Sequence, residues 1–358
     1  MKHHALWLCA GLLTLAACGK SEQGLDQTGP QPDLPEQRQT LLPPMKIATP
    51  AGWDGEKPTA PRGFTVTALA TGLAIPRQTL VLPNGDILVA EGSGGGASAL
   101  RPKDVIATYI KAMGKSSVKG GNRVTLLRDA DNDGRAELRT SFITGLNAPY
   151  GLAYVDGQIY VADQDALVRF PYREGVTRIT SPGVELLKLP SHINHHWTKS
   201  LTAGPDGSRL YVGIGSNSNV GERGMGVEQD RAVIWEIDRQ SGMHRTYASG
   251  IRNPTALAIE PRTQRLWAVV NERDELGPQL VPDYLTSVRP GAFYGWPYSY
   301  WGQNVDPRVR PQKPDMVRRA TRPDYALGSH VAALGVSFTT DGGFGGGFSE
   351  GAFVGEHG

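Results

Sequence analysis

The strongest constraint on the fold of this chain is a short pattern that recurs along it. Each copy has an apolar run, a polar turn that usually contains Gly or Asp, and a second short run rich in β-forming residues. Four copies are clear and a fifth is weaker, and they span residues 79–93, 151–165, 201–217, 257–273 and 336–358. Alternating hydrophobicity and turn chemistry predict that each copy is two short strands joined by a turn.

The intervals between the copies predict the architecture. Further strand-like runs, NRVTLLRD, ALVRFPY and AVIWEID, lie between them. Four strands in each unit of roughly 40–50 residues or more are the signature of a β-propeller. We therefore predict an all-β fold with five recognisable blades over residues 63–358. The sequence stops after an apolar β-run, so we expect either a closed five-bladed ring or a chain without its last blade.

Residues 101–117 break the β pattern. Apolar side chains recur there at helical spacing, at Val105, Ile106, Tyr109, Ile110 and Met113. This spacing predicts a helix inserted in a blade loop, with its apolar side packed on the body. The alternative is a helix that shapes the mouth of a site. The charge of the chain does not indicate a strongly charged partner. A formal net charge of +2 gives no reason to expect that the chain binds nucleic acid or an acidic protein.

The first seventeen residues predict export. A short basic start precedes an apolar run, ALWLCAGLLTLAA, which has signal-peptide length and is too short to span a bilayer. The run ends in LAAC, which resembles a bacterial lipobox and implies cleavage before Cys18 and lipid attachment to its sulfur. The alternative is a plain secretory signal, residues 1–17, followed by an incidental cysteine.

The lipobox sets further expectations for the exported chain. Cys9 would leave with the signal, so the remaining cysteine is acylated and the chain has neither disulfides nor thiol catalysis. Gly19 follows Cys18, which by the usual sorting pattern indicates the periplasmic face of the outer membrane, with the lipid as the only membrane contact. Residues 18–62 are polar and rich in Pro, Gln and Gly, and predict a tether that ends near Gly63.

Polar residues occupy equivalent positions in several units. Asn-His-His at 194–196 precedes the third unit, Arg-Asn at 252–253 precedes the fourth, and NERDE at 271–275 follows the β-run of the fourth. Loops from several blades converge on one face of a propeller, so we expect these side chains to share a site. Adjacent histidines are poorly suited to a zinc site of three or four ligands. The aromatic residues of 293–301 are expected to pack in the core and in part to line the site.

Several segments resemble the six-bladed PQQ-dependent sugar dehydrogenases of the soluble glucose, aldose and sorbosone dehydrogenase type. The matching segments are HWTKSL ahead of GPDG, GIRNPTALAI, NERDELGPQLVPDYLTSV, FYGWP and GAFVGEHG. The forms HHWTKSL and NERDELG are most similar to the sorbosone dehydrogenase-like branch. In that family the chain continues after EHG, so the resemblance implies a six-bladed propeller whose last blade is missing from this sequence.

The resemblance implies hydride transfer from a sugar to the quinone C5 carbonyl of PQQ. His196 matches the family's base, which removes the hydroxyl proton, and a neutral imidazole suits that task. Arg252 matches the cation that faces the quinone oxygen and stabilises its developing charge. The alternative for His195 and His196 is that they are solvated loop residues. The alternative for Arg-Asn-Pro is that it only forms a turn at the entry to a strand. PQQ has three carboxylates, and its expected contacts are Arg252, Asn253, Lys199, Arg273 and His195.

Two loops are candidates for Ca²⁺. The resemblance implies that backbone carbonyls of Asp274 and Glu275 hold an ion beside the quinone C5 carbonyl. The second loop is DADNDG, in which Asp129, Asp131 and Asp133 have the spacing of the first half of an EF-hand loop. Its position twelve is Thr rather than Glu, and Asp, Asn and Gly also favour hairpin turns, so a turn without an ion is the alternative.

The function expected from the resemblance is PQQ- and Ca²⁺-dependent oxidation of an aldose or a sugar aldehyde. The electrons would pass to a cytochrome or to a quinone, and nothing in the sequence chooses between them. A non-catalytic propeller lipoprotein that binds carbohydrate or a protein partner is the main alternative. Calcium-dependent lactone hydrolysis is a third function, but it needs several channel carboxylates, and the channel motifs offer histidine, arginine and asparagine first.

Overall fold

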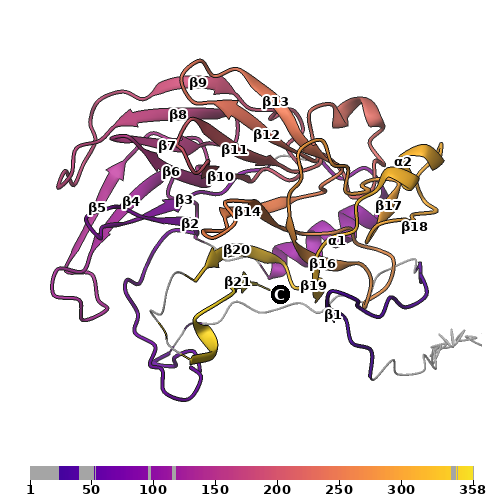
Figure 1. The fold of residues 1–358 in the computed structure, drawn as a ribbon, viewed down its shortest axis with the longest axis horizontal. Coiled ribbons are helices and arrows are strands. Elements are labelled where there is room, and N and C mark those ends of the chain that lie inside the picture. Colours follow the sequence, from indigo (N-terminus) through magenta and orange to yellow (C-terminus); the bar gives the residue numbers. More distant parts are fainter. Residues whose placement is uncertain are drawn as a thin grey trace, which may run out of the picture.

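The computed structural model of the chain describes residues 24–39, 52, 54–95, 98–114, 118–339, 344 and 346–357. Within these residues the dominant structure is a set of antiparallel sheets arranged side by side in an arc (Figure 1). The chain is all-β, as the repeats predict. No helix in the described ranges is long and apolar enough to cross a membrane.

Four sheets contain the strand order of propeller blades, in which four strands pair one after another in chain order, although two short strands of another sheet lie between the last two strands of the fourth. The first sheet contains β2 (Pro76–Val81), β3 (Ile87–Glu91), β4 (Arg123–Arg128) and β5 (Leu138–Ile143). The second contains β6 (Gly151–Val155), β7 (Gln158–Ala162), β8 (Ala166–Pro171) and β9 (Val184–Lys188). The third contains β10 (Lys199–Ala203), β11 (Arg209–Ile214), β12 (Val233–Asp238) and β13 (His244–Ser249). The fourth contains β14 (Pro254–Ile259), β15 (Leu266–Val270), β16 (Pro282–Ser287) and β19 (Tyr325–Ser329).

A fifth sheet contains only β20 (Ala333–Phe338) and β21 (Ala352–Glu356). The five repeats of the sequence coincide with the hairpins β2–β3, β6–β7, β10–β11, β14–β15 and β20–β21, so each predicted strand pair is confirmed. The five predicted blades are therefore four complete blades and one two-stranded sheet in the described part of the chain. The smaller elements are β17 (Ser299–Tyr300), β18 (Asn304–Val305), α2 (Pro314–Arg319), η1 (Met225–Glu228) and η2 (Gly346–Phe348).

The apolar core lies between neighbouring sheets. Leu88 and Leu126 of the first sheet share one buried cluster with Leu152 and Val161 of the second. Each such side chain contributes roughly 1.5–3 kcal/mol by leaving water. Strands next to these clusters carry nearly continuous buried runs, such as the last four residues of β3 and β7. This packing holds the loops at the strand ends in fixed positions.

Residues 24–39 belong to the fold, which corrects the prediction that all of residues 18–62 form a tether. β1 (Thr28–Gly29) pairs with β19 and is the outer strand of the fourth sheet. Leu34 packs on the core of that sheet, and the Gln37 amide donates to Tyr300 Oη at 2.9 Å. The sequence pattern could not reveal this strand, because two residues cannot show an apolar period. Cys18 and the predicted signal lie outside the described residues.

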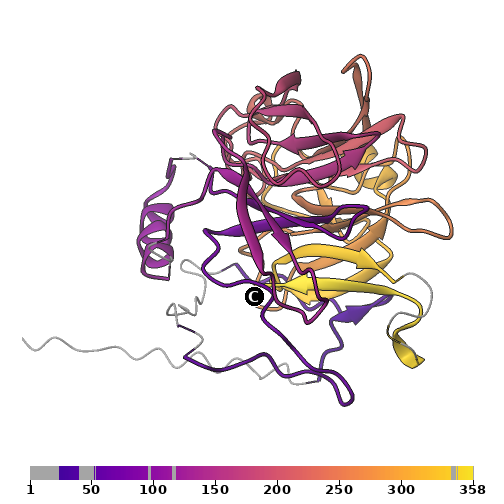
Figure 2. The ribbon, with the colours of Figure 1, turned by 90° about the vertical axis from the view of Figure 1, so that its left-hand side faces the viewer.

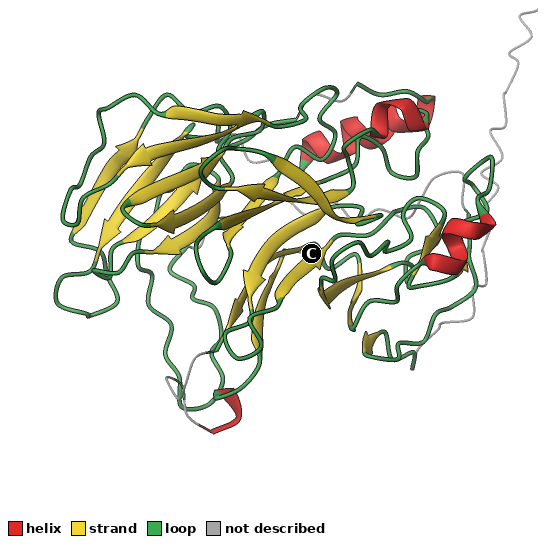
Figure 3. Cartoon of the chain, turned by 45° about the horizontal axis from the view of Figure 1, so that its top comes forward, coloured by secondary structure: helices red, strands yellow, loops and turns green. Residues whose placement is uncertain are grey.

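α1 (Pro102–Met113) is the helix predicted in residues 101–117, and it lies between β3 and β4. The expectation that its apolar side packs on the body is wrong. Val105, Ile106, Tyr109 and Met113 are all exposed. Figures 2 and 3 show α1 standing outside the sheets on one side of the molecule.

Candidate active site

Loops between the blades surround a cavity of about 710 Å³. Its lining includes seven residues that the sequence predicted for one site, namely His195, His196, Arg252, Asn253, Asn271, Glu272 and Asp274. The structure adds Trp197, Asp283 and His330. Most of these residues lie in the segments that precede β10 and β14 or follow β15 and β19. The convergence of blade loops that a propeller predicts is therefore present.

The hydrogen bonds of His196 determine which ring nitrogen can accept a proton. Nδ1 lies 2.9 Å from the carbonyl oxygen of Ser216 and 3.0 Å from its Oγ, which donates to the carbonyl of Ser218. A carbonyl oxygen only accepts, so Nδ1 carries the hydrogen and Nε2 keeps a lone pair. Burial lowers the pKa of His196 well below 6.5, and the charges of Arg252 and His195 add to the shift. His196 is therefore a neutral base at neutral pH.

Arg252 is buried in the cavity wall and is held by oxygen atoms on several sides. Its Nε donates to the carbonyl of Asn219 at 3.1 Å, its Nη1 to the carbonyl of Glu272 at 2.6 Å, and its Nη2 to Asn219 Oδ1 at 2.9 Å. Asn219 Oδ1 also accepts the backbone N–H of Asp274 at 2.9 Å, so one side chain positions both the cation and the loop after β15. The guanidinium is a fixed positive charge beside the neutral base.

Asn253 and His195 complete this wall. Asn253 Oδ1 accepts from Thr198 Oγ1 at 3.4 Å, and the rings of His195 and His196 are perpendicular with centroids 4.7 Å apart. Gly215 lies directly against them. A Cβ added to Gly215 would lie 2.5 Å from both Asn253 Oδ1 and His196 Cβ, which is far inside contact distance. The base can occupy its position only because this residue has no side chain.

Lys199 lies behind the cavity wall, although it was predicted to contact the cofactor. It is fully buried, and its Nζ donates to Asn194 Oδ1 at 3.1 Å and to the carbonyl of Trp197 at 2.9 Å. Arg231 is also buried and donates to the same Asn194 oxygen at 3.3 Å and to the carbonyl of His196 at 2.8 Å. Burial lowers the pKa of Lys199 well below 10.5 and that of Arg231 to about 10. Two buried basic side chains thus hold the loop that carries the base, and among the described residues neither donates to a carboxylate.

Arg273 also faces away from the cavity, although it was predicted to bind the cofactor. It is fully buried and forms ion pairs with Glu272 at 3.0 Å and with Asp306 at 3.3 Å. Its two neighbours, Glu272 and Asp274, line the cavity, because successive side chains of an extended segment point to opposite sides. The aromatic cluster of 293–301 packs in the core, and the cavity lining contains none of its six described rings, Phe293, Tyr294, Trp296, Tyr298, Tyr300 and Trp301.

Three carboxylates line the cavity, and the sequence motifs had suggested few. Asp283 is almost fully buried and accepts the backbone N–H groups of Glu272 at 2.7 Å and of Ala332 at 2.9 Å. Burial raises the pKa of Asp283 to about 6, and the charge of Glu272 adds to this. Oε1 of Glu272 is buried and has no hydrogen-bond partner in the described part of the chain. An orphaned carboxylate oxygen beside a second carboxylate is an arrangement that a cation would satisfy.

Asp274 and Glu275 differ in their surroundings. Asp274 lines the cavity and pairs with Nδ1 of His330 at 3.5 Å, and the hydrogen bond to this carboxylate, together with its charge, raises the pKa of His330. Glu275 pairs instead with Arg101 at 3.3 Å, at the start of α1, and is absent from the cavity lining. His330 directly follows β19, just as Asn271 directly follows β15, so a comparison of strand ends between blades could have found it.

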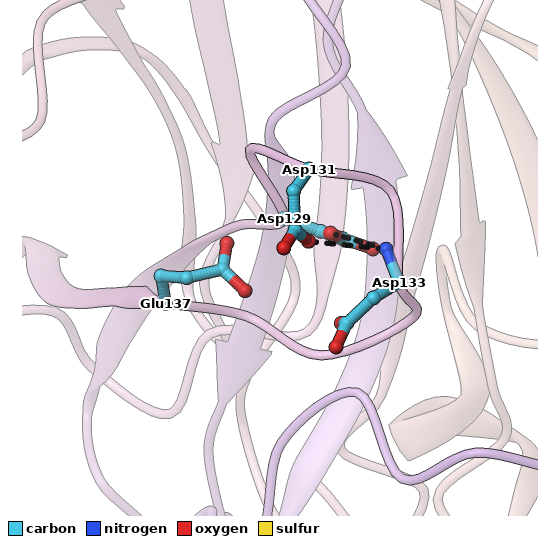
Figure 4. A group of neighbouring side chains, drawn as sticks. All are labelled: Asp129, Asp131, Asp133 and Glu137. Carbon is cyan, nitrogen blue, oxygen red and sulfur yellow. Dashed lines mark hydrogen bonds between the residues drawn. The ribbon is translucent and has the colours of Figure 1, made fainter.

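The DADNDG loop lies between β4 and β5, and its residues are not part of the cavity lining. One carboxylate oxygen from each of Asp129, Asp131, Asp133 and Glu137 lies within 4.8 Å of the others (Figure 4). Glu137 was not anticipated. Asp129 accepts the backbone N–H groups of Asp133 at 3.1 Å and of the next glycine at 2.8 Å, which closes the loop as a turn. A turn accounts for these two hydrogen bonds without an ion. Calcium binding at this loop stays a prediction.

Three solved structures share this architecture. An iodide structure of the Trichoderma reesei enzyme of carbohydrate-active family AA12 has a TM-score of 0.63, with 18% identity over 83% of this chain and 77% of that chain. The PQQ domain of pyranose dehydrogenase from Coprinopsis cinerea has a TM-score of 0.62, with 17% identity over 79% of this chain and 72% of that one. PQQ-bound aldose sugar dehydrogenase from Streptomyces coelicolor has a TM-score of 0.52, with 18% identity over 82% and 84%. Likenesses at these identities show the fold alone.

Sequence comparison gives the family. An uncharacterised protein of Borreliella burgdorferi is 23% identical over 232 residues, which cover 60% of this chain and 58% of that protein. The chain therefore spans little more than half the length of this relative. Residues 58–291, well over half of the chain, match the family described as TrAA12-like, and the chain belongs to that family.

Proposed function

We propose that the chain is a PQQ- and Ca²⁺-dependent dehydrogenase that oxidises an aldose or a sugar aldehyde, of the sorbosone dehydrogenase-like type. The observation that carries this proposal is the neutral His196 beside the fixed cation Arg252 in one cavity. Membership of the TrAA12-like family supports it, as does the likeness to pyranose and aldose dehydrogenases described with PQQ. A calcium structure of the Trichoderma enzyme supports the choice of ion.

His196 takes the proton of the substrate hydroxyl at Nε2 in this proposal. The chemistry that bound PQQ would supply is a hydride acceptor for the carbon that carries the hydroxyl. The Nδ1–H group donates to the carbonyl of Ser216, and this hydrogen bond strengthens as the ring becomes charged. The low pKa of His196 ensures that the ring is unprotonated before the reaction begins.

The charges around the cavity fit an anionic cofactor. PQQ carries three carboxylates, and the buried guanidinium groups of Arg252 and Arg231 give the cavity a positive potential on the side of the base. Of these two, only Arg252 lines the cavity and can contact the cofactor directly. Asn253 and His195 are its neighbours in the wall and would contact the same ligand.

The carboxylates fit a bound Ca²⁺. The orphaned Oε1 of Glu272 and the carboxylate of Asp283 would supply anionic oxygens. The carbonyl of Asp274 already accepts Asn219 Nδ2 at 3.1 Å and Arg308 Nη1 at 2.8 Å, so it is not included in this ligand set. Oxygen donors of this kind are the ligands that a hard cation prefers. We therefore propose the pair Glu272 and Asp283 as calcium ligands in place of Glu275, which is turned toward α1.

A dye-linked oxidation assay tests the proposal. The chain from residue 19 is incubated with PQQ and Ca²⁺ and offered a panel of aldoses and sorbosone, while quinone absorbance of the purified protein reports cofactor binding. We expect His196→Ala to lower kcat/KM by about 10²–10⁴-fold with PQQ still bound, and Arg252→Ala to weaken PQQ binding itself. If PQQ does not bind and no sugar is oxidised, the chain is instead a propeller that binds carbohydrate or a protein partner.

Calcium-dependent lactone hydrolysis is a second candidate function, because three carboxylates line the cavity where the sequence motifs had suggested few. A Ca²⁺ ion held by carboxylates could polarise a lactone carbonyl without any redox cofactor. Lactone hydrolysis that needs Ca²⁺ but is indifferent to PQQ, and that Glu272→Gln abolishes, would favour this function. Sugar oxidation that needs both cofactors would exclude it.

We also propose that Cys18 carries a lipid that anchors the protein to the periplasmic face of the outer membrane. The lipobox-like LAAC and the following glycine support this proposal. Labelled palmitate should be incorporated into the wild-type chain and not into a Cys18→Ser variant, and the wild-type chain should fractionate with outer membranes. A secreted, unlabelled chain would contradict the anchor.

A further inference from the structure

The apolar stripe of α1 is uncovered. Val105 is 59% exposed, Ile106 46%, Tyr109 70% and Met113 57%, and their spacing places them along one side of the helix. Leu100 and Val118, just outside the helix, are each 50% exposed. A continuous row of apolar side chains of this length on a surface marks a contact with something outside the chain.

The charge around α1 indicates what that partner is. Residues 101–119 contain five Lys or Arg residues and one Asp, a net charge of +4, while the chain as a whole has a net charge of +2. The rest of the chain is therefore net negative. Arg101 is used in ion pairs with Asp104 and Glu275, and the lysines occur near both ends of the helix. A helix with an apolar stripe and basic flanks is suited to the interface of an anionic bilayer.

The predicted lipid would reach the same region. The loop after β15 holds both the start of α1, through Arg101 and Glu275 at 3.3 Å, and the N-terminal segment, through the amide of Gln27 and the carbonyl of Gln279. Because residues 24–39 are part of the fold, only residues 19–23 separate Cys18 from the described chain. Six residue steps span at most about 20 Å. A lipid on Cys18 would thus keep this side of the molecule close to the membrane.

We infer that α1 is an interfacial helix that lies in the headgroup region of an anionic phospholipid bilayer, with its apolar stripe facing the acyl chains. Thr108 of α1 lines the catalytic cavity, so this contact places the mouth of the cavity beside the membrane. The inference departs from the expectation that the lipid is the only membrane contact. It rests on exposure and charge, and it holds whichever reaction the cavity performs.

Vesicle binding tests the inference without the lipid anchor. The chain from residue 18 with Cys18→Ser keeps every described residue and contains no other cysteine, because the sequence has only Cys9 and Cys18. Sedimentation measures its binding to two kinds of vesicle. One kind is phosphatidylcholine alone, and in the other about one lipid in three is the anionic phosphatidylglycerol. We expect binding to the anionic vesicles that falls about fivefold for each lysine replaced by glutamine.

Two variant pairs make the test specific to α1. Ile106→Ser combined with Tyr109→Ser should weaken binding about tenfold or more, whereas Met243→Ser, at a β12–β13 turn residue that is 73% exposed, should not change it. A fluorophore on Val105→Cys should shift to the blue with vesicles, and one on Met243→Cys should not. Unchanged far-UV circular dichroism shows that the variants are folded.

Three results would each overturn the inference. They are no binding to anionic vesicles, equal binding to zwitterionic and anionic vesicles, and full binding by the doubly substituted helix. In the first case the stripe is a docking surface for a protein, and in the third the membrane contact lies elsewhere on the chain.

Discussion

Arg231 Nη2 donates to the carbonyl oxygen of His196 at 2.8 Å, so a buried guanidinium holds the backbone of the candidate base. Its charge also opposes protonation of the imidazole, as one of several causes that lower the pKa of His196, after burial, Arg252 and His195. Arg231 therefore affects both the position and the protonation state of His196. It can be substituted without any change to the imidazole ring itself.

The pH dependence of kcat/KM for sugar oxidation should show the effect of Arg231 on the pKa of His196. Wild-type kcat/KM should lose activity on the acid side only well below pH 6.5, because the pKa of His196 is lowered. Arg231→Gln removes a positive charge, which raises the pKa of His196, so the acid limb should move to higher pH. Arg231→Lys keeps the charge and should leave the limb near its wild-type position. A limb that stays in place in Arg231→Gln would show that Arg231 has no electrostatic effect on the base.

Gly215 should be indispensable for the geometry of the base. In Gly215→Ala the new Cβ would lie 2.5 Å from His196 Cβ, so the histidine must move. A misplacement of about 1 Å can cost on the order of 10²-fold in kcat. Gly226→Ala is the matched control, since a Cβ at Gly226 meets no atom within 4 Å and should leave kcat unchanged. Steady-state kinetics of the two variants, with PQQ binding measured in parallel, checks the prediction.

Asp163 should make stability depend on pH near neutrality. Burial raises its pKa to about 7, its Oδ1 has no partner among the described residues, and its Oδ2 accepts the backbone N–H of Asn147 at 3.0 Å. An unfolded Asp titrates near 3.9, so the folded state favours the protonated form. The contribution is complete below the unfolded value and is lost as pH rises through about 7.

Asp163→Asn removes that titration. As pH rises from about 4, where the unfolded Asp titrates, to about 7, where the folded one does, wild type should lose on the order of a few kcal/mol relative to Asp163→Asn. Thermal melts at several pH values measure the difference in Tm. Parallel curves for the two proteins would mean that the buried carboxyl finds a partner when it ionises.

Sequence patterns predicted the hairpins well, because each turn and each apolar run is a local signal. They predicted the direction of single side chains less well. Lys199 and Arg273 sit in the right segments, yet each side chain points into the body, since neighbours in an extended chain alternate. Asp283 and Glu272 come together only through the pairing of β15 with β16, and no local pattern carries that contact.

The N-terminal segment should contribute to stability as a packed element. Leu34 is partly buried against the core of the fourth sheet, so Leu34→Ala should lower the free energy of unfolding by about 1–2 kcal/mol. Leu100→Ala, at an exposed leucine, should change it by less than about 0.5 kcal/mol. Denaturant titrations of both variants make the comparison. Equal stabilities would mean that residues 24–39 add little to the folded state.

The pairing of β1 with β19 also imposes an order on how the protein assembles. Thr28 meets Leu327, a partner almost three hundred residues further along the chain. The hairpins within each blade can form from neighbouring residues as soon as those residues are available, but this contact requires closure of nearly the whole chain. The outer edge of the fourth blade is thus among the last backbone surfaces to be covered. Until then β19 presents unpaired N–H and C=O groups, which makes the late folding intermediate the species most prone to aggregate.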